Sequence, residues 1–433
     1  EEQTSLSAKG TSDTLVSLRY TLHGPVVFID TALKKGYAIR CAWLEPGGAP
    51  YLAALRFDQA KNWKEFRDAC RYNHIPAENM IWADKKGNIG WQVAGIAPVR
   101  KNFSGMVPVP GDGRYEWNGY LDMLKRPHQL NPKKGFLATA NQNVTPKDYR
   151  YWDAIGYTWA DPYRGDRINE VLQADNRQTL KKTEALQTDY YSIPARKLIP
   201  MLAELKFSSP LYEAAKEELG KWNFVLNKSS VAAGIYAIWE RELYQWSDSL
   251  LVPKELKGLV NIQLEKLITW LQAPDSRFDN FVDARNGFLA HTFKSAIDKL
   301  NKKFGASIDS WVYGQADYKH ISLFHPLNHL LAPEQKKKFN LGPLSRGGNS
   351  HTPNSTGSRD NQLSGASFRL ITDLSDWDKT LMINTPGESG IPGNSYYGDL
   401  FTLWADDQYF PAYYSKGKIE EVTDNRMILK PLQ

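Results

Sequence analysis

The chain of 433 residues is long enough for two or three conventional domains or one large α+β domain, and its 42% hydrophobic and 24% charged residues argue against disorder. Its net charge of +6 is spread along the sequence, without the basic tract interleaved with aromatic residues that is typical of nucleic-acid binding. No apolar run reaches about 18 residues, so we expect no membrane span.

The first part of the chain is predicted to be rich in β-strand. Apolar and polar residues alternate over residues 16–22, which is the period of a half-buried strand. A second strand is expected at residues 36–44, and residues 80–94 have the pattern of a hairpin. Between these strands, residues 60–73 have the spacing of a helix.

The middle of the chain is predicted to be helical, and its last part returns to β-strand. Apolar residues share one helical face at residues 232–246, 255–272 and 291–304. Strands are expected at residues 365–374 and 380–384, followed by a loop rich in Gly and Pro. The order β, helical, β predicts one interwoven α+β domain rather than separable ones. Its three parts are residues 1–174, 175–305 and 306–433.

The two cysteines, Cys41 and Cys70, are too few for a disulfide scaffold in a chain of this size. Whether they pair with each other is left open by the sequence. Their number excludes a zinc site of four cysteines, and their spacing excludes a finger of two cysteines and two histidines. The chain starts at Glu1, without an initiator Met or a signal peptide, so we expect a processed or excised part of a longer product.

The usual catalytic patterns are weak or missing in this sequence. His325 and His329 are four residues apart, but Pro326 lies between them and disfavours the helix that a metal pair would need. Ser389 lies in the sequence GESG, which lacks the spacing of a nucleophile elbow and occurs in a Pro-rich loop. Two interpretations remain: the chain is a binding module, or it is part of an enzyme whose nucleophile lies elsewhere.

Several stretches, in the same order, resemble sequence patterns of the penicillin acylase family of N-terminal nucleophile hydrolases. The stretches are YTLHGPVV, AKNWKEFRDA followed by PAENMIWADKKGNIGWQVAGIAPVR, PVPGDGRYEWNGYLD, NPKKGFLATANQNVTPKDY, GASFRLITDLSDWD and NTPGESGIPGNSYYGDLFTLW. They extend over about residues 15 to 420. The resemblance implies an αββα sandwich portion with an inserted helical region.

The family's nucleophile is a Ser at the mature N-terminus of the β subunit, exposed by autocatalytic cleavage, with its own α-amine as base. Because Glu1 is not Ser, this chain resembles the larger, C-terminal part of the β subunit. We therefore expect the α subunit and the nucleophile segment as partners, and we expect this chain alone to be inactive. The family is usually periplasmic or secreted in bacteria.

The resemblance assigns the oxyanion-binding side chain to Asn141. An amide N–H fixed in a dry pocket stabilises a developing oxyanion by about 3 to 4 kcal/mol. The alternative is that Asn141 only bonds the backbone of a turn. Asn143 matches no family role and is expected to be the turn residue.

Two further positions carry over from the family. Arg167, in GDRINEVL, matches the Arg that orients the oxyanion Asn; Arg164 is the alternative if the alignment slips. A surface Arg167 that pairs with Asp166 or Glu170 is also open. Asp153 occupies the place of a calcium ligand in those family members that bind calcium, and no organic cofactor is expected.

The substrate class remains open. Where the family's namesake has a pocket Trp, this sequence has Ala54, which disfavours a pocket of the same size. Long-chain acyl amides, including acyl homoserine lactones, are therefore as plausible as penicillins. A binding module from a different class, such as a carbohydrate-binding protein, would use ridges of exposed Trp. Most Trp here, including Trp43 and Trp91, fall inside strand or helix patterns that favour packing.

Overall fold

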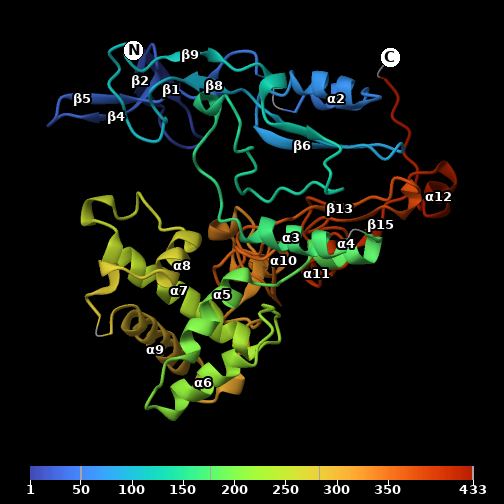
Figure 1. The fold of residues 1–433 in the computed structure, drawn as a ribbon. Helices are drawn as coiled ribbons and strands as arrows, with labels where there is room; N and C mark the ends of the chain where they lie inside the picture. The colour runs from blue at the N-terminus through green and yellow to red at the C-terminus, as the bar shows by residue number, and fades with distance from the viewer. Residues whose placement is uncertain (49–50, 176, 282, 432–433) are drawn as a thin grey trace. The chain divides into compact units, whose positions relative to one another are not determined.

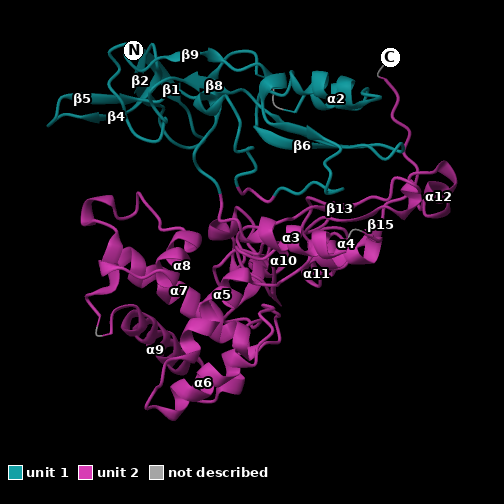
Figure 2. Cartoon of the chain, in the orientation of Figure 1, with its two compact units in different colours: residues 1–139, 143–159 teal, residues 140–142, 160–433 magenta. Residues whose placement is uncertain are grey.

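The computed structural model describes residues 1–48, 51–175, 177–281 and 283–431. The chain forms two compact units (Figure 2), of which the first comprises residues 1–139 and 143–159. The second comprises residues 140–142 and 160–433, so the short segment that carries Asn141 belongs with the helical part. The division into three parts rests on secondary structure rather than compactness, and it stays a prediction.

The first unit consists mainly of short antiparallel strands (Figure 1). Its sheets are β1 (Glu2–Leu6) with β2 (Thr14–Leu18); β3 (Tyr20–Thr21), β4 (Gly24–Asp30) and β5 (Lys35–Ala38); β6 (Glu78–Ala83), β7 (Ile89–Ala94) and β10 (His128–Leu130); and β8 (Pro98–Arg100) with β9 (Trp117–Tyr120). Its α-helices are α1 (Ala54–Phe57) and α2 (Trp63–Cys70).

The predicted hairpin at 80–94 and the helix at 60–73 are confirmed as β6, β7 and α2. The side chain of Asn62 accepts the backbone N–H of Glu65 at 3.0 Å, which caps the first turn of α2. Helix α2 then packs on β7 at Gly90, where a Cβ would lie 2.4 Å from the indole of Trp63. Only glycine leaves room for this contact.

The predicted strand at 36–44 is wrong in its second half. Strand β5 ends at Ala38, which pairs with Val26 near the start of β4, so little of the partner strand remains for the residues beyond it. Residues 42–44 instead form a 3₁₀ turn in which Trp43 is 59% exposed, contrary to the packing that we expected for this side chain. The strand expected at 16–22 is interrupted between β2 and β3.

Cys41 and Cys70 are both free thiols, which answers the question of pairing that the sequence leaves open. Cys70 lies in the small core of the first unit with Phe66, Ala94 and Met123. Burial there raises the pKa of the Cys70 thiol to about 12, so it is protonated at neutral pH and a poor nucleophile.

The second unit is mainly helical and contains the largest apolar core of the described residues. Its helices are α3 (Tyr163–Ala174), α4 (Leu180–Gln187), α5 (Ile193–Ala203), α6 (Pro210–Gly220), α7 (Val231–Leu251), α8 (Leu264–Gln272), α9 (Ala284–Phe304), α10 (Pro333–Phe339), α11 (Asp399–Ala405) and α12 (Lys416–Glu421). Its strands are β11 (His320–Leu323), β12 (Leu341–Ser345), β13 (Arg369–Ile371), β14 (Leu381–Ile383) and β15 (Phe410–Pro411). Figure 1 shows helices α5 to α9 grouped in one part of this unit.

The helices expected at 232–246 and 291–304 are confirmed as α7 and α9, and the indole N–H of Trp239 in α7 joins them by bonding Thr292 Oγ1 at 3.2 Å. The helix expected at 255–272 is wrong in its first half. Gly258 adopts a left-handed φ of +80°, which ends regular structure, and α8 begins only at Leu264. The strands expected at 365–374 and 380–384 are found in shorter form as β13 and β14. None of the helices in the described part of the chain is long and apolar enough to cross a membrane.

Candidate functional site

Asn141 is held by two contacts to the start of α3. Its backbone has a φ of +68°, a left-handed conformation that Asn tolerates better than most residues. Its carbonyl oxygen accepts the N–H of Ala160 at 3.0 Å, and its side-chain Oδ1 accepts Nη2 of Arg164 at 2.7 Å. Residues 141 and 160–164, which are separated in sequence by a segment of the first unit, therefore meet within the second unit.

The Arg164 contact determines which way the Asn141 amide points. A guanidinium group has five donors and no acceptor, so it can bind only the oxygen of the amide. With Oδ1 occupied, the two N–H donors of Nδ2 are turned away from Arg164, and the side chain is exposed on this chain. Burial lowers the pKa of Arg164 from its usual value, but arginine remains charged at neutral pH. The pair thus presents amide donors in a fixed orientation.

The neighbouring residue Gln142 packs tightly against the first turn of α3. Its side-chain oxygen accepts the N–H of Ala140 at 2.7 Å, which folds the side chain back over its own segment. A Cβ at Gly165 would lie 2.3 Å from the amide nitrogen of Gln142, so a larger residue at position 165 would displace this side chain. Glycine at this position lets segment 140–142 approach the helix closely.

Arg167 has partners other than Asn141. Its Nε donates to Oδ2 of Asp189 at 2.6 Å, and its guanidinium lies 4.2 Å from the ring centroid of Tyr191. A longer ion pair to Glu170 measures 3.9 Å, which agrees with one of the pairings that the sequence left open. The structure therefore brings Arg164, the alternative from the alignment, to Asn141, whereas Arg167 fastens α3 to Asp189. The catalytic roles of both stay predictions.

Asn143 and Asp153, the other two polar residues singled out in this part of the sequence, belong to the first unit. Asn143 accepts the backbone N–H of Thr145 at 3.0 Å, which confirms it as the turn residue. Asp153 is exposed in a 3₁₀ turn of the first unit. No group of three or more His, Cys, Asp or Glu that could hold a metal occurs among the described residues, and the assignment of Asp153 to calcium stays a prediction.

Ser389 and His325 have structural partners. The hydroxyl oxygen of Ser389 accepts the N–H of Ile391 at 3.1 Å in a turn, and its own N–H bonds Tyr396. The imidazole Nδ1 of His325 accepts the N–H of Leu327 at 3.1 Å and its ring packs edge-on against Phe339. These contacts agree with the structural interpretation of both residues.

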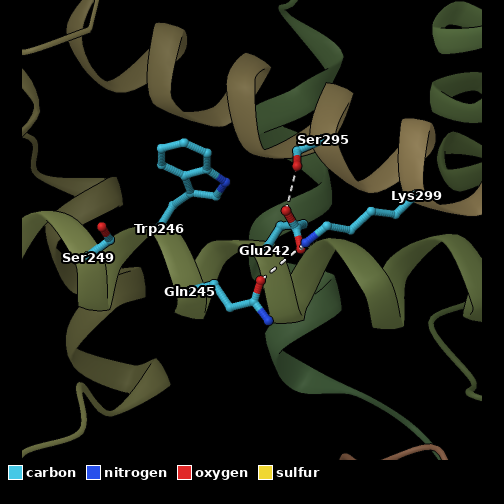
Figure 3. Close-up of a pocket in the computed structure, with 6 residues that line it drawn as sticks. All are labelled: Glu242, Gln245, Trp246, Ser249, Ser295 and Lys299. Carbon is cyan, nitrogen blue, oxygen red and sulfur yellow. Dashed lines mark hydrogen bonds and ion pairs between the residues drawn. The ribbon is translucent and has the colours of Figure 1, made fainter. Parts of the chain in front are cut away.

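A pocket of about 320 Å³ is lined by residues of α7 and α9 (Figure 3), and Asn141 is not among them. Its lining residues are Glu242, Gln245, Trp246, Ser249, Ser295 and Lys299. The buried carboxylate of Glu242 accepts Ser295 Oγ at 2.5 Å and is paired with Lys299. Because the carboxylate of Glu242 is already paired with Lys299 and Ser295, it is not a free base, and we do not assign the pocket to catalysis.

Sequence patterns did not point to a cluster of buried polar side chains beside the start of α3. Asp161, Glu240 and His351 are each about nine-tenths buried or more, and they come from three distant parts of the chain. No local spacing connects them, so a single sequence offered no signal for their proximity.

The fold defines a class of protein. The chain superposes over its full length on 82% of a thermostable penicillin G acylase from Alcaligenes faecalis, with a TM-score of 0.73 and 20% sequence identity. This likeness shows the N-terminal nucleophile hydrolase fold and confirms the α+β class that the sequence predicted. The penicillin amidase family model matches residues 1–421, and the chain belongs to that family.

Curated relatives are of two kinds. An acyl-homoserine lactone acylase, QuiP, of Pseudomonas fluorescens is 28% identical over 90% of this chain and 51% of the relative. A penicillin acylase 2 proenzyme of a Pseudomonas species is 23% identical over 98% of this chain and 55% of the relative. The chain thus spans about half the length of these curated relatives.

Proposed function

We propose that this chain is part of a hydrolase that cleaves linear amide bonds of N-acyl compounds, releasing a carboxylic acid and an amine. The observation that carries the proposal is the Asn141 amide, whose oxygen is bound by Arg164 and whose N–H donors are turned outward. Membership of the penicillin amidase family supports this function. In this role, Asn141 binds the oxyanion that forms when a nucleophile attacks the amide carbonyl.

The nucleophile, in this proposal, is a Ser at a β-subunit N-terminus outside this chain, freed by autocatalytic processing. Its hydroxyl adds to the carbonyl while its own α-amine takes the proton, and water later hydrolyses the acyl-enzyme. The length of the curated relatives, about twice the matched part, leaves room for such a segment and for an α subunit. The chain alone is then inactive, because it orients the oxyanion without supplying the attacking group.

Exposed apolar side chains on β4, in the first unit, support a partner polypeptide outside this chain. Val27, Phe28 and Ile29 of β4 are 57%, 59% and 41% exposed, and Leu22 before them is 83% exposed. A run of large apolar residues left open in water is characteristic of an interface rather than of a free surface. We assign these exposed side chains to contacts with the α subunit or the N-terminal β segment of the same precursor.

For the substrate, acyl homoserine lactones are the first class to test and penicillins the second. Relatives of both names match the chain: the QuiP lactone acylase matches 90% of it at 28% identity, and the penicillin acylase 2 proenzyme matches 98% of it at 23%. Ala54, where the family's namesake has a pocket Trp, supports a pocket different from the one that binds phenylacetyl groups. The alternative of a carbohydrate-binding module finds less support, because Trp43 is the only tryptophan classed as exposed among the described residues and forms no ridge with others.

The experiment compares this chain with the protein expressed from its complete gene, which we call the complete enzyme. Both are incubated with N-octanoyl and N-dodecanoyl homoserine lactone and with penicillin G, and the released amine is quantified by chromatography. We expect amine release by the complete enzyme and none by the chain alone. Hydrolysis of none of these amides by the complete enzyme would contradict the proposal, and activity of the isolated chain would refute the assignment of the nucleophile.

The two arginines at the start of α3 are expected to respond differently to substitution. Arg164→Gln should lower the kcat of the complete enzyme by about 10-fold to 100-fold at similar KM, because a charge-assisted hydrogen bond of about 1.5 to 3 kcal/mol no longer orients Asn141. Arg167→Gln should mainly lower thermal stability, because Asp189 loses its partner. Steady-state kinetics and thermal unfolding of both variants separate the two roles. A larger decrease in kcat for Arg167→Gln would instead support Arg167 as the arginine that orients Asn141.

Calcium binding and a periplasmic or secreted location stay predictions. Asp153 supplies one exposed carboxylate, and the proposal routes no catalytic step through a metal. The relatives are bacterial.

A further inference from the structure

We propose that Asp161 is a positioning residue that holds the oxyanion-binding amide in place by anchoring the start of α3 to the start of α8. This inference rests on the proposed function of Asn141. Asp161 lies outside the sequence motifs that carry the family resemblance, and its contacts reach across more than 100 residues of the chain.

The carboxylate of Asp161 caps a helix to which it does not belong. Its Oδ1 accepts the N–H of Glu265 at 3.0 Å and its Oδ2 accepts that of Leu264 at 3.2 Å, the first two residues of α8. The residue that precedes α8, Gln263, makes no side-chain capping bond. A carboxylate at this end of a helix satisfies orphan donors and is favoured by the helix dipole. The side chain is only 10% exposed, so these bonds are shielded from water.

The residues on either side of Asp161 hold Asn141. Ala160 binds the backbone carbonyl of Asn141, and Arg164 binds its side-chain oxygen. Asn141 therefore has its backbone and its side chain fastened to the same five-residue segment, 160–164. Within that segment, and among the residues that the structure describes, only Asp161 bonds α8 through its side chain.

Buried polar side chains enclose the other side of Asp161. The Nδ1 atom of His351 lies 3.9 Å from Asp161 Oδ2, and its Nε2 atom lies 3.2 Å from the hydroxyl of Tyr244 and 3.9 Å from Glu240. Asn349 donates to Glu240 at 3.1 Å, which joins the loop carrying His351 to α7. Asp161 is thus enclosed between α8 and a cluster of buried polar side chains.

By anchoring segment 160–164, Asp161 fixes the position of the Asn141 amide before the substrate reacts. An oxyanion donor is effective only if it already lies where the negative charge will form, and displacement by about 1 Å can cost about 100-fold in rate. When Asp161 is removed, the two N–H groups of α8 lose their acceptor and segment 160–164 loses its anchor. The amide of Asn141 would still be present but would be held less firmly.

The test compares Asp161→Ala with Asp161→Asn and with Ser230→Ala in the complete enzyme. Ser230 caps α7 by accepting the N–H of Ala233 at 3.0 Å, so its loss destabilises the same unit without touching segment 140–142 or 160–164. We expect Asp161→Ala to lower kcat by about 10-fold to 100-fold at similar KM, and Asp161→Asn, which keeps one acceptor oxygen, to restore part of it. Ser230→Ala should keep kcat when each variant is assayed equally far below its melting temperature.

A second readout does not depend on amidase activity. Amide hydrogen exchange over residues 138–142, followed by mass spectrometry, should be faster in Asp161→Ala than in the wild type and unchanged in Ser230→Ala. Equal kcat and equal exchange in the two alanine variants would overturn the positioning role. If the wild-type complete enzyme cleaves no amide, the proposed function fails, whereas the exchange result still decides whether Asp161 fixes Asn141.

Discussion

Replacing Asn141 by aspartate is expected to lower the kcat of the complete enzyme by about 100-fold to 1,000-fold while substrate binding is retained. Aspartate has the same shape, can still accept the hydrogen bond of Arg164, and tolerates the left-handed backbone at φ +68°. It has no N–H to offer, however, and its charge repels the developing oxyanion. Steady-state kinetics and the affinity for a competing product acid separate loss of turnover from loss of binding.

Two further substitutions of Asn141 separate the loss of its amide donors from the cost of its left-handed backbone conformation. Asn141→Gly removes the amide at a φ that glycine adopts freely, and Asn141→Ala removes the same donors but adds a backbone cost of about 1 kcal/mol. Both should lose most turnover and the hydrogen bond of Arg164, and the alanine variant should unfold more easily than the glycine variant. Turnover that survives in Asn141→Gly would show that Asn141 serves the turn alone.

Replacing Asp407 by asparagine is expected to destabilise the second unit by about 3 to 5 kcal/mol. The carboxylate of Asp407 accepts hydrogen bonds from Arg346 at 3.2 Å and from Arg369 at 3.1 Å, and both guanidinium groups are about 1% exposed. Trp404 packs against both, with its ring centroid 4.7 Å and 5.2 Å from them. Asn keeps the left-handed φ of +58° at position 407 but leaves two buried cations without their anion.

The adjacent residue provides a matched control for this prediction. Asp406 pairs with Lys228 at 2.8 Å, and both side chains are about half exposed, so Asp406→Asn should change the free energy of unfolding by less than about 1 kcal/mol. Adding Arg369→Met to Asp407→Asn should recover part of the lost stability, because one uncompensated buried charge is removed. Urea unfolding followed by tryptophan fluorescence measures all three variants. Equal effects at positions 406 and 407 would show that the buried charges are solvated.

Local patterns predicted the elements whose stability is local. Helix α2 begins where Asn62 can cap it, and β6 and β7 form a hairpin because Asp84 accepts the backbone N–H groups of Lys86 and Asn88 in the turn between them. The long helices α7 and α9 were predictable because their apolar faces repeat over many turns.

The two failed predictions have the same cause: the stability of a strand or helix there depends on residues distant in the sequence, which a local pattern does not include. Residues 42–44 have the composition of a strand, but the partner strand β4 begins at Gly24 and leaves them almost nothing to pair with. Residues before Leu264 repeat an apolar pattern, but Leu256 and Val260 remain 44% and 46% exposed, so no burial stabilises a helix there. Strand pairing requires a neighbouring strand, and helix burial requires other elements that pack on the apolar face.

The sequence by itself determined the family resemblance, the α+β class, and the separation of Asn141 from the turn residue Asn143, because these depend on residue types and spacing along the chain. Only the tertiary structure decided that Arg164 rather than Arg167 meets Asn141, and that Asp161 connects the same segment to α8. The physical reason is that a side chain three residues further along a helix points about 60° away, so two plausible arginines meet different partners once the helix is docked. The orientation of α3 is determined by its packing against segments distant in the sequence, and a local sequence pattern does not predict that packing.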